Sequence, residues 1–125
     1  MGEGLRFEAP HAHHRFETDG DTKSAYSPVQ HLLLALASCT AADIIDIVTK
    51  MRVSISGLEL NIEGDRNEEP PRYFKAIRMH YVARGVAEED RVKIQRAIDL
   101  SHEKYCSVLH SLRKDIVVTN ILELA

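Results

Sequence analysis

The chain of 125 residues has no tryptophan, only two cysteines and no cluster of basic residues. Its 16 Lys and Arg residues are outnumbered by 19 Asp and Glu residues, and the formal net charge is −3. Because proteins that bind nucleic-acid phosphates concentrate their positive charge, this balance does not favour a nucleic-acid partner. No uninterrupted apolar run approaches the roughly 18 residues of a membrane span, and the first residues lack the basic start and apolar core of a signal peptide. We therefore expect a cytoplasmic protein without a nucleic-acid or membrane partner.

The scarcity of cysteine also limits the chemistry. In a reducing cytoplasm a permanent disulfide is disfavoured, so the two cysteines are either free thiols, a redox pair or part of a metal site. An apolar fraction of 44% and a charged fraction of 28% are enough for one hydrophobic core in a chain of this length. We expect a single domain over residues 1–125.

The hydrophobic patterns predict groups of strands separated by helices. Two short strands, LRFEA and HRFET, are expected to form an N-terminal hairpin, with Pro10 between them. Further strands are expected in VSISGLELNIEGD, starting at Gly57 or bulged there, in YFKAIRMHYVARG at 73–85 and in DIVVTNILEL at 115–124. Helices that separate antiparallel hairpins are typical of the α+β class, so we do not expect a doubly wound parallel sheet.

A long helix is expected over residues 27–51. Ser27 can cap it, Pro28 suits its first position, and Gln30 completes a capping box with Ser27. From Leu32 to Ala42 the segment is apolar on nearly every face. We therefore expect a central helix that packing covers on most sides, and that is buried from Leu32 to Ile47.

A second helix is expected over residues 88–105, where three acidic residues open the helix at the positive end of its dipole. Its apolar stripe contains Ile94, Ala97, Ile98, Ser101 and Tyr105. Continuation of this stripe should bury Val108 or Leu109.

The two cysteines lie in different surroundings. Cys39 lies in the most apolar segment of the chain, where a free cysteine is by default a small, inert hydrophobic residue. Cys106 follows a helix and precedes SVLHSL, so it can begin a new helical turn. Unpaired backbone N–H groups at such a position lower the pKa of a thiol.

Seven histidines raise the possibility of a metal site, especially those of HAHH at 11–14 together with His31, His102 and His110. No CxxC or HExxH spacing accompanies them. A solvated strand at 11–14 explains the run better than a metal site does, and His102 and His110 are interpreted as surface residues. We expect no metal and no cofactor.

Two motifs resemble those of the OsmC/Ohr family, the osmotically inducible and organic hydroperoxide resistance proteins. They are SPVQHLLLALASCTAADIIDI and SHEKYCSVLHSL, whose cysteines lie 67 positions apart, and the form SHEKYCSV is most similar to the YhfA-like branch. The resemblance implies an OsmC-like fold, with antiparallel sheets and two long central helices. It also implies an intertwined homodimer with active sites at the subunit interface.

The resemblance further implies a thiol-dependent peroxidase of oxidative stress defence, without metal or prosthetic group. Cys39 would match the cysteine that attacks an organic hydroperoxide, and Cys106 would resolve the resulting sulfenic acid as a disulfide. A small dithiol or another cellular thiol would reduce the pair again.

The sequence departs from this family at the residues that support the thiolate. Peroxidases of the family carry an acidic residue just after the motif proline and an arginine in the N-terminal hairpin. Here Val29 and Gln30 occupy the acidic positions. Arg15 is the best candidate for the arginine, with Arg6 as a weaker one, and Glu103 is a possible substitute carboxylate.

Two alternatives therefore stay open beside the peroxidase. The first is a non-catalytic OsmC-like protein that binds a hydrophobic small molecule at the dimer interface. The second is a thiol redox sensor. Turnover in excess dithiol would distinguish both from a peroxidase.

Overall fold

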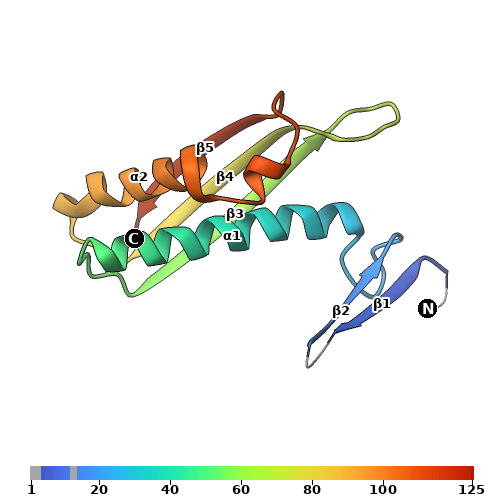
Figure 1. The fold of residues 1–125 in the computed structure, drawn as a ribbon, viewed down its shortest axis with the longest axis horizontal. Coiled ribbons are helices and arrows are strands. Elements are labelled where there is room, and N and C mark those ends of the chain that lie inside the picture. The colour runs from blue at the N-terminus through green and yellow to red at the C-terminus, as the bar shows by residue number, and fades with distance from the viewer. Residues whose placement is uncertain (1–3, 12–13) are drawn as a thin grey trace. The chain divides into compact units, whose positions relative to one another are not determined.

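A computed structural model describes residues 4–11 and 14–125 (Figure 1). The chain forms two compact units, Met1–Leu34 and Ala35–Ala125. Helix α1, Pro28–Lys50, begins in the first unit and continues in the second.

The N-terminal unit contains the predicted hairpin. Strand β1, Arg6–His11, pairs antiparallel with β2, His14–Asp19. Pro10 does not separate the two strands as expected, because it lies within β1 and pairs with Arg15.

The start of α1 is the predicted capping box. The Ser27 amide donates to Gln30 Oε1 at 2.9 Å, and the Gln30 amide donates to Ser27 Oγ at 3.2 Å. The two side chains thus satisfy backbone groups that the first helical turn leaves unpaired.

The second unit is built on a three-stranded sheet with the order β3-β4-β5. Strand β3, Gly57–Arg66, starts at Gly57 and pairs antiparallel with β4, Phe74–Arg84. Strand β5, Val117–Leu124, pairs parallel with β4. The α+β class is confirmed, but the expectation of antiparallel sheets alone was wrong for β5. The helical connection between β4 and β5 is a crossover, which brings the chain back to run in the same direction.

The core of this unit combines one face of β4 with one stripe from each helix. On β4 the predicted face of Ile77, Met79, Tyr81 and Ala83 is buried. Helix α1 and helix α2, Arg91–Leu100, run along the sheet (Figure 1). Their buried residues are Leu36, Thr40, Ile44 and Val48 from α1, and Ile94, Ala97 and Ile98 from α2.

The prediction that α1 is covered on most sides was wrong for the isolated chain. Its buried residues recur every four positions and form a single stripe, whereas Leu32, Leu34 and Ile45 are exposed. One sheet and one neighbouring helix can cover only one side of it. By length and composition α1 could also cross a membrane, but core helices of soluble proteins pass the same test.

Helix α2 is preceded by a short 3-10 turn, η1, Glu88–Asp90, and followed by a wide turn of π-helix, η2, Ser101–Tyr105. In η2 the Cys106 amide donates to the Ser101 carbonyl, five residues earlier, at 2.8 Å. The wider turn shifts the buried stripe by one residue. Cys106 is therefore completely buried, while Tyr105 is 50% exposed and its predicted place in the stripe was wrong. Val108 and Leu109 are only half-buried.

Candidate dithiol site

The two cysteines come together although they are far apart in the sequence. Cys39 lies on α1, and Cys106 follows η2. Both are free thiols, and their Sγ atoms lie within 4.8 Å of each other. Cys39 is half-buried and Cys106 is buried. The sulfur atoms are therefore close enough for direct thiol chemistry after small side-chain rotations.

Two neighbours contact the Cys106 sulfur. Thr40 Oγ1 lies 3.5 Å from Sγ, and the Leu109 amide donates to Sγ at 3.4 Å. The Thr40 hydroxyl donates its single hydrogen to the Leu36 carbonyl at 2.9 Å, so in this arrangement the Cys106 thiol is the donor toward Thr40. The resting arrangement thus suits a protonated Cys106.

The pKa of the Cys106 thiol agrees with this arrangement. Burial raises the pKa above the ordinary value of a thiol, and the Leu109 amide, which donates to the sulfur, lowers it by less. The neighbouring Cys39 raises it further. The sequence correctly predicted a short helical turn after Cys106, which is η3, Leu109–Ser111. It wrongly predicted a lowered pKa there, because burial outweighs the backbone N–H group.

A carboxylate completes the site. Asp43 follows Cys39 by one helical turn, and one of its oxygens lies within 4.8 Å of both sulfur atoms. Ser101 Oγ donates to Asp43 Oδ2 at 2.9 Å and links α1 to the end of α2. Asp43 was not identified from the sequence, although its i, i+4 spacing from Cys39 could have indicated it. Glu103, the expected substitute carboxylate, is exposed on η2 and does not belong to this group.

The other expected supporting residues lie in the N-terminal unit. Arg15 is largely exposed, and its guanidinium lies 3.8 Å from Glu8. Arg6 pairs with Glu17 at 2.6 Å. Gln30 is occupied by the capping box. The roles of Arg15 and Gln30 toward the cysteines stay predictions.

The ring nitrogens of His31, His102 and His110 lie within hydrogen-bond distance of other protein groups. His31 Nε2 lies 2.8 Å from the Glu17 carbonyl oxygen, and His110 Nε2 lies 3.0 Å from the His102 carbonyl oxygen. His102 Nε2 lies 2.8 Å from the Tyr81 hydroxyl. The expectation that His102 is a surface residue was wrong, because it is half-buried, and burial lowers the pKa of its imidazole. In the run at 11–14, His13 and the His11 side chain lie outside the described residues.

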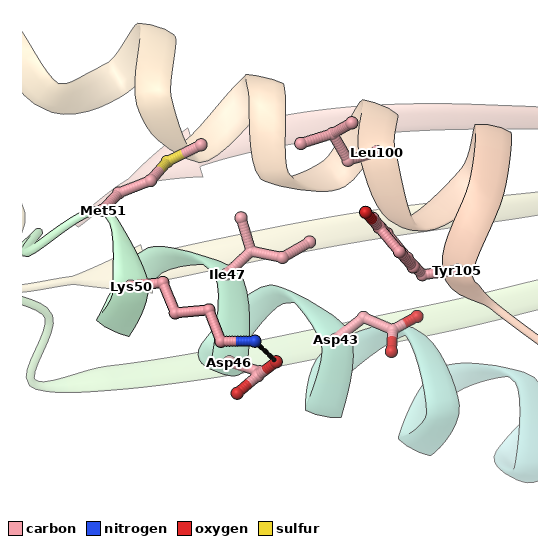
Figure 2. A pocket seen from close by; sticks show the side chains of 7 residues that line it. All are labelled: Asp43, Asp46, Ile47, Lys50, Met51, Leu100 and Tyr105. Atoms are coloured by element: carbon pink, nitrogen blue, oxygen red, sulfur yellow. Dashed lines mark hydrogen bonds and ion pairs between the residues drawn. The ribbon is translucent and has the colours of Figure 1, made fainter.

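A pocket of about 430 Å³ opens beside the site between α1 and η2 (Figure 2). Asp43 and Tyr105 lie at one end and Met51 at the other, and the Lys50 ammonium pairs with Asp46 at 3.0 Å. Ile47 and Leu100 add apolar surface. Asp43 lines the pocket and also lies beside Cys39 and Cys106. A molecule bound in the pocket could therefore reach the neighbourhood of the two sulfur atoms.

The structure is thus that of a small α+β protein in which the fold brings together two thiols, one from α1 and one from the end of η2. The chain belongs to the OsmC family, since the family model described as OsmC-like protein matches residues 19–120.

Individual relatives agree with this assignment. The chain is 37% identical to Protein YhfA of Escherichia coli (strain K12) over 123 residues, which cover 97% of this chain and 91% of that protein. A hypothetical protein from Aquifex aeolicus VF5 has a similar structure, with a TM-score of 0.87, 25% identity and coverage of 100% and 91%. An organic hydroperoxide resistance protein OsmC from Legionella pneumophila shares the fold at a TM-score of 0.65, with 16% identity and coverage of 98% and 99%.

Proposed function

We propose that the chain is a thiol-dependent peroxidase that reduces organic hydroperoxides to alcohols through Cys39 and Cys106. The observation that carries this proposal is the approach of the two free sulfur atoms to within 4.8 Å. Membership of the OsmC family supports it, as does a fold neighbour named as an organic hydroperoxide resistance protein.

In the first step the Cys39 thiolate attacks the terminal oxygen of the hydroperoxide. A sulfur–oxygen bond forms, the oxygen–oxygen bond breaks, and the departing alkoxide takes a proton to become the alcohol. Cys39 is left as a sulfenic acid. Cys39 suits this step better than Cys106, because Cys39 is partly accessible whereas Cys106 is fully buried with a raised pKa.

In the second step the Cys106 sulfur attacks the Cys39 sulfenic acid. A disulfide forms, the sulfur–oxygen bond breaks, and hydroxide leaves as water with the proton that Cys106 gives up. The Asp43 carboxylate is close enough to accept that proton on the way. A small dithiol or another cellular thiol then reduces the disulfide.

Arg15, Gln30 and Glu103 remain proposed supporting residues, with Arg15 as the cation for the Cys39 thiolate. Gln30 has a structural role in the capping box whether or not it contacts substrate.

We also propose a cytoplasmic homodimer. Two free cysteines suit a reducing compartment. The exposed Leu32, Leu34 and Ile45 of α1 form apolar surface that a second copy of the chain would cover.

The pocket favours one alternative, the non-catalytic binding of a small molecule. Its lining combines apolar residues with Asp43, Asp46 and Lys50, so its ligand would carry polar groups as well as an apolar part. The thiol redox sensor is the other alternative.

A turnover assay tests the proposal. The reduced chain is mixed with cumene hydroperoxide and excess dithiothreitol or dihydrolipoamide, and we expect many equivalents of peroxide to be consumed. Ser107→Ala, beside Cys106 on the exposed side, is the control. Consumption of a single equivalent despite excess dithiol would instead indicate a sensor, and no consumption would indicate a binding protein.

A further inference from the structure

We propose that Cys39, Asp43 and Cys106 form a binding site for a thiophilic divalent cation, and that Zn²⁺ fits this donor set best. The spacing of these three residues in the sequence does not indicate this site, because it matches no metal-binding motif. The fold brings them together from α1 and the end of η2.

The positions of the donor atoms support a shared ion. The two sulfur atoms and a carboxylate oxygen all lie within 4.8 Å of one another. Zinc–sulfur bonds of about 2.3 Å and zinc–oxygen bonds of about 2.0–2.2 Å place tetrahedral ligand atoms roughly 3.3–3.8 Å apart. The three side chains therefore need to contract only slightly around the ion. Two thiolates favour Zn²⁺ over Mg²⁺ or Ca²⁺, which prefer oxygen ligands.

Neighbouring groups already orient two of the donors. Ser101 Oγ donates to Asp43 Oδ2 at 2.9 Å and fixes the direction of the carboxylate. The Leu109 amide donates to Cys106 Sγ at 3.4 Å and would stabilise the charge of a bound thiolate. Such outer contacts are typical of metal centres, where they hold the ligands in place.

Binding exchanges one Zn²⁺ ion for two thiol protons. One Zn²⁺ enters, both thiols lose their protons to solvent, and the carboxylate binds as it is, so two protons are released for each ion. The fourth position is left for water or an added ligand. No oxidant or reductant takes part.

The metal-bound and disulfide forms exclude each other, because both use the same two sulfur atoms. If the peroxidase proposal holds, Zn²⁺ would therefore protect the thiols from peroxide and inhibit turnover. This consequence rests on the proposed function, whereas metal binding itself does not.

Titration of the reduced full chain with Co²⁺, without peroxide, tests the site. We expect one ion per chain, sulfur-to-cobalt charge-transfer absorption and tetrahedral ligand-field bands, all displaced by Zn²⁺. Competition with a chromophoric chelator then gives the Zn²⁺ affinity. Asp43→Asn and Ser101→Ala should each weaken binding about 10–100-fold, as changes to metal-site supporting groups do.

Two controls exclude other sites. Asp46→Asn changes an exposed carboxylate on the same helix that pairs with Lys50, and should leave affinity unchanged. The triple change His11→Ala, His13→Ala and His14→Ala removes the histidine run and should leave the cobalt spectrum unchanged. Alkylation of the partly accessible Cys39 in the folded wild-type chain should abolish the spectrum, which avoids dependence on the folding of cysteine variants.

Three results would overturn the proposal. One is a cobalt spectrum without sulfur charge transfer, and another is an Asp43→Asn variant that binds as tightly as the wild type. The third is half an ion per chain, which would mean that two chains share the metal. A chain that binds Zn²⁺ but consumes no peroxide would contradict only the proposed peroxidase.

Discussion

The Cys106 amide donates to the Ser101 carbonyl at 2.8 Å and closes a turn that is one residue wider than that of an α-helix. Ser101 and Cys106 are both fully buried as a result. The Ser101 hydroxyl faces Asp43, and the Cys106 sulfur faces Thr40. The wide turn therefore places the end of α2 against the thiol-bearing part of α1.

The first prediction separates the roles of the two cysteines. Cys39→Ser should abolish even single-turnover consumption of cumene hydroperoxide, because it removes the attacking sulfur. Cys106→Ser should keep a burst of about one equivalent and then stall, with a sulfenic acid at Cys39 that dimedone traps. Rapid-mixing kinetics and mass spectrometry measure both outcomes.

The opposite pattern would reverse the assignment. If Cys39→Ser keeps the burst and Cys106→Ser loses it, then Cys106 attacks the peroxide despite its burial. Ser107→Ala serves as the control for changes at the end of η2 and should behave as the wild type.

Much of the fold could be predicted from local pattern. The capping box at Ser27 and Gln30 depends on contacts three residues apart, and it was predicted correctly. The alternation in β4 likewise identified its buried face. The parallel pairing of β5 with β4 could not be predicted in this way, because strand direction depends on where a long connection returns.

The site was less accessible to sequence reasoning. A regular helical period predicted that Tyr105 is part of the buried stripe. In the structure a single wide turn shifts the stripe by one residue, so Cys106 is buried instead. Asp43 was missed because an acidic residue on a helix is most often solvated, and only the fold shows that Ser101 and the thiols surround it.

A second prediction concerns the buried contact between Thr40 and Cys106. Thr40→Val keeps the shape of the side chain but leaves the Cys106 thiol without its acceptor, so the reduced chain should lose about 1 kcal/mol of unfolding free energy. Thr40→Ser keeps the hydroxyl and is the matched control. Urea unfolding of the reduced chain measures the difference. A Thr40→Val variant as stable as the wild type would show that the contact at 3.5 Å contributes nothing.

A third prediction tests the proposed dimer. Ile45→Lys introduces a charge on the exposed side of α1, and it should convert a dimer to monomers because an interface would bury that charge unpaired. Val92→Lys makes the same change at an exposed apolar residue of α2 and should leave the dimer intact. Sedimentation at micromolar concentration shows whether each variant is a dimer or a monomer. A folded wild-type monomer under these conditions would contradict the dimer directly.

The last prediction is a pH dependence of stability that arises from His102. Burial lowers the pKa of its imidazole below the ordinary value of about 6.5, and the nearby Asp99 offsets this only in part. The unfolded chain therefore binds a proton more readily than the folded chain does as the pH falls below that value. The contribution of neutral His102 to the free energy of unfolding should be complete above about pH 6.5. It should be lost as the pH falls from there through the lowered pKa of the folded state.

His102→Gln isolates this contribution, because glutamine can still hydrogen-bond the Tyr81 hydroxyl but does not titrate. Urea unfolding between pH 7 and pH 5, with a chelator present, should show a larger loss of stability for the wild type than for His102→Gln. His80→Gln, at a partly exposed histidine of β4 that lies 3.5 Å from Glu123, should follow the wild type. If His102→Gln lost as much stability over this range as the wild type, protonation of a buried His102 would not be the cause.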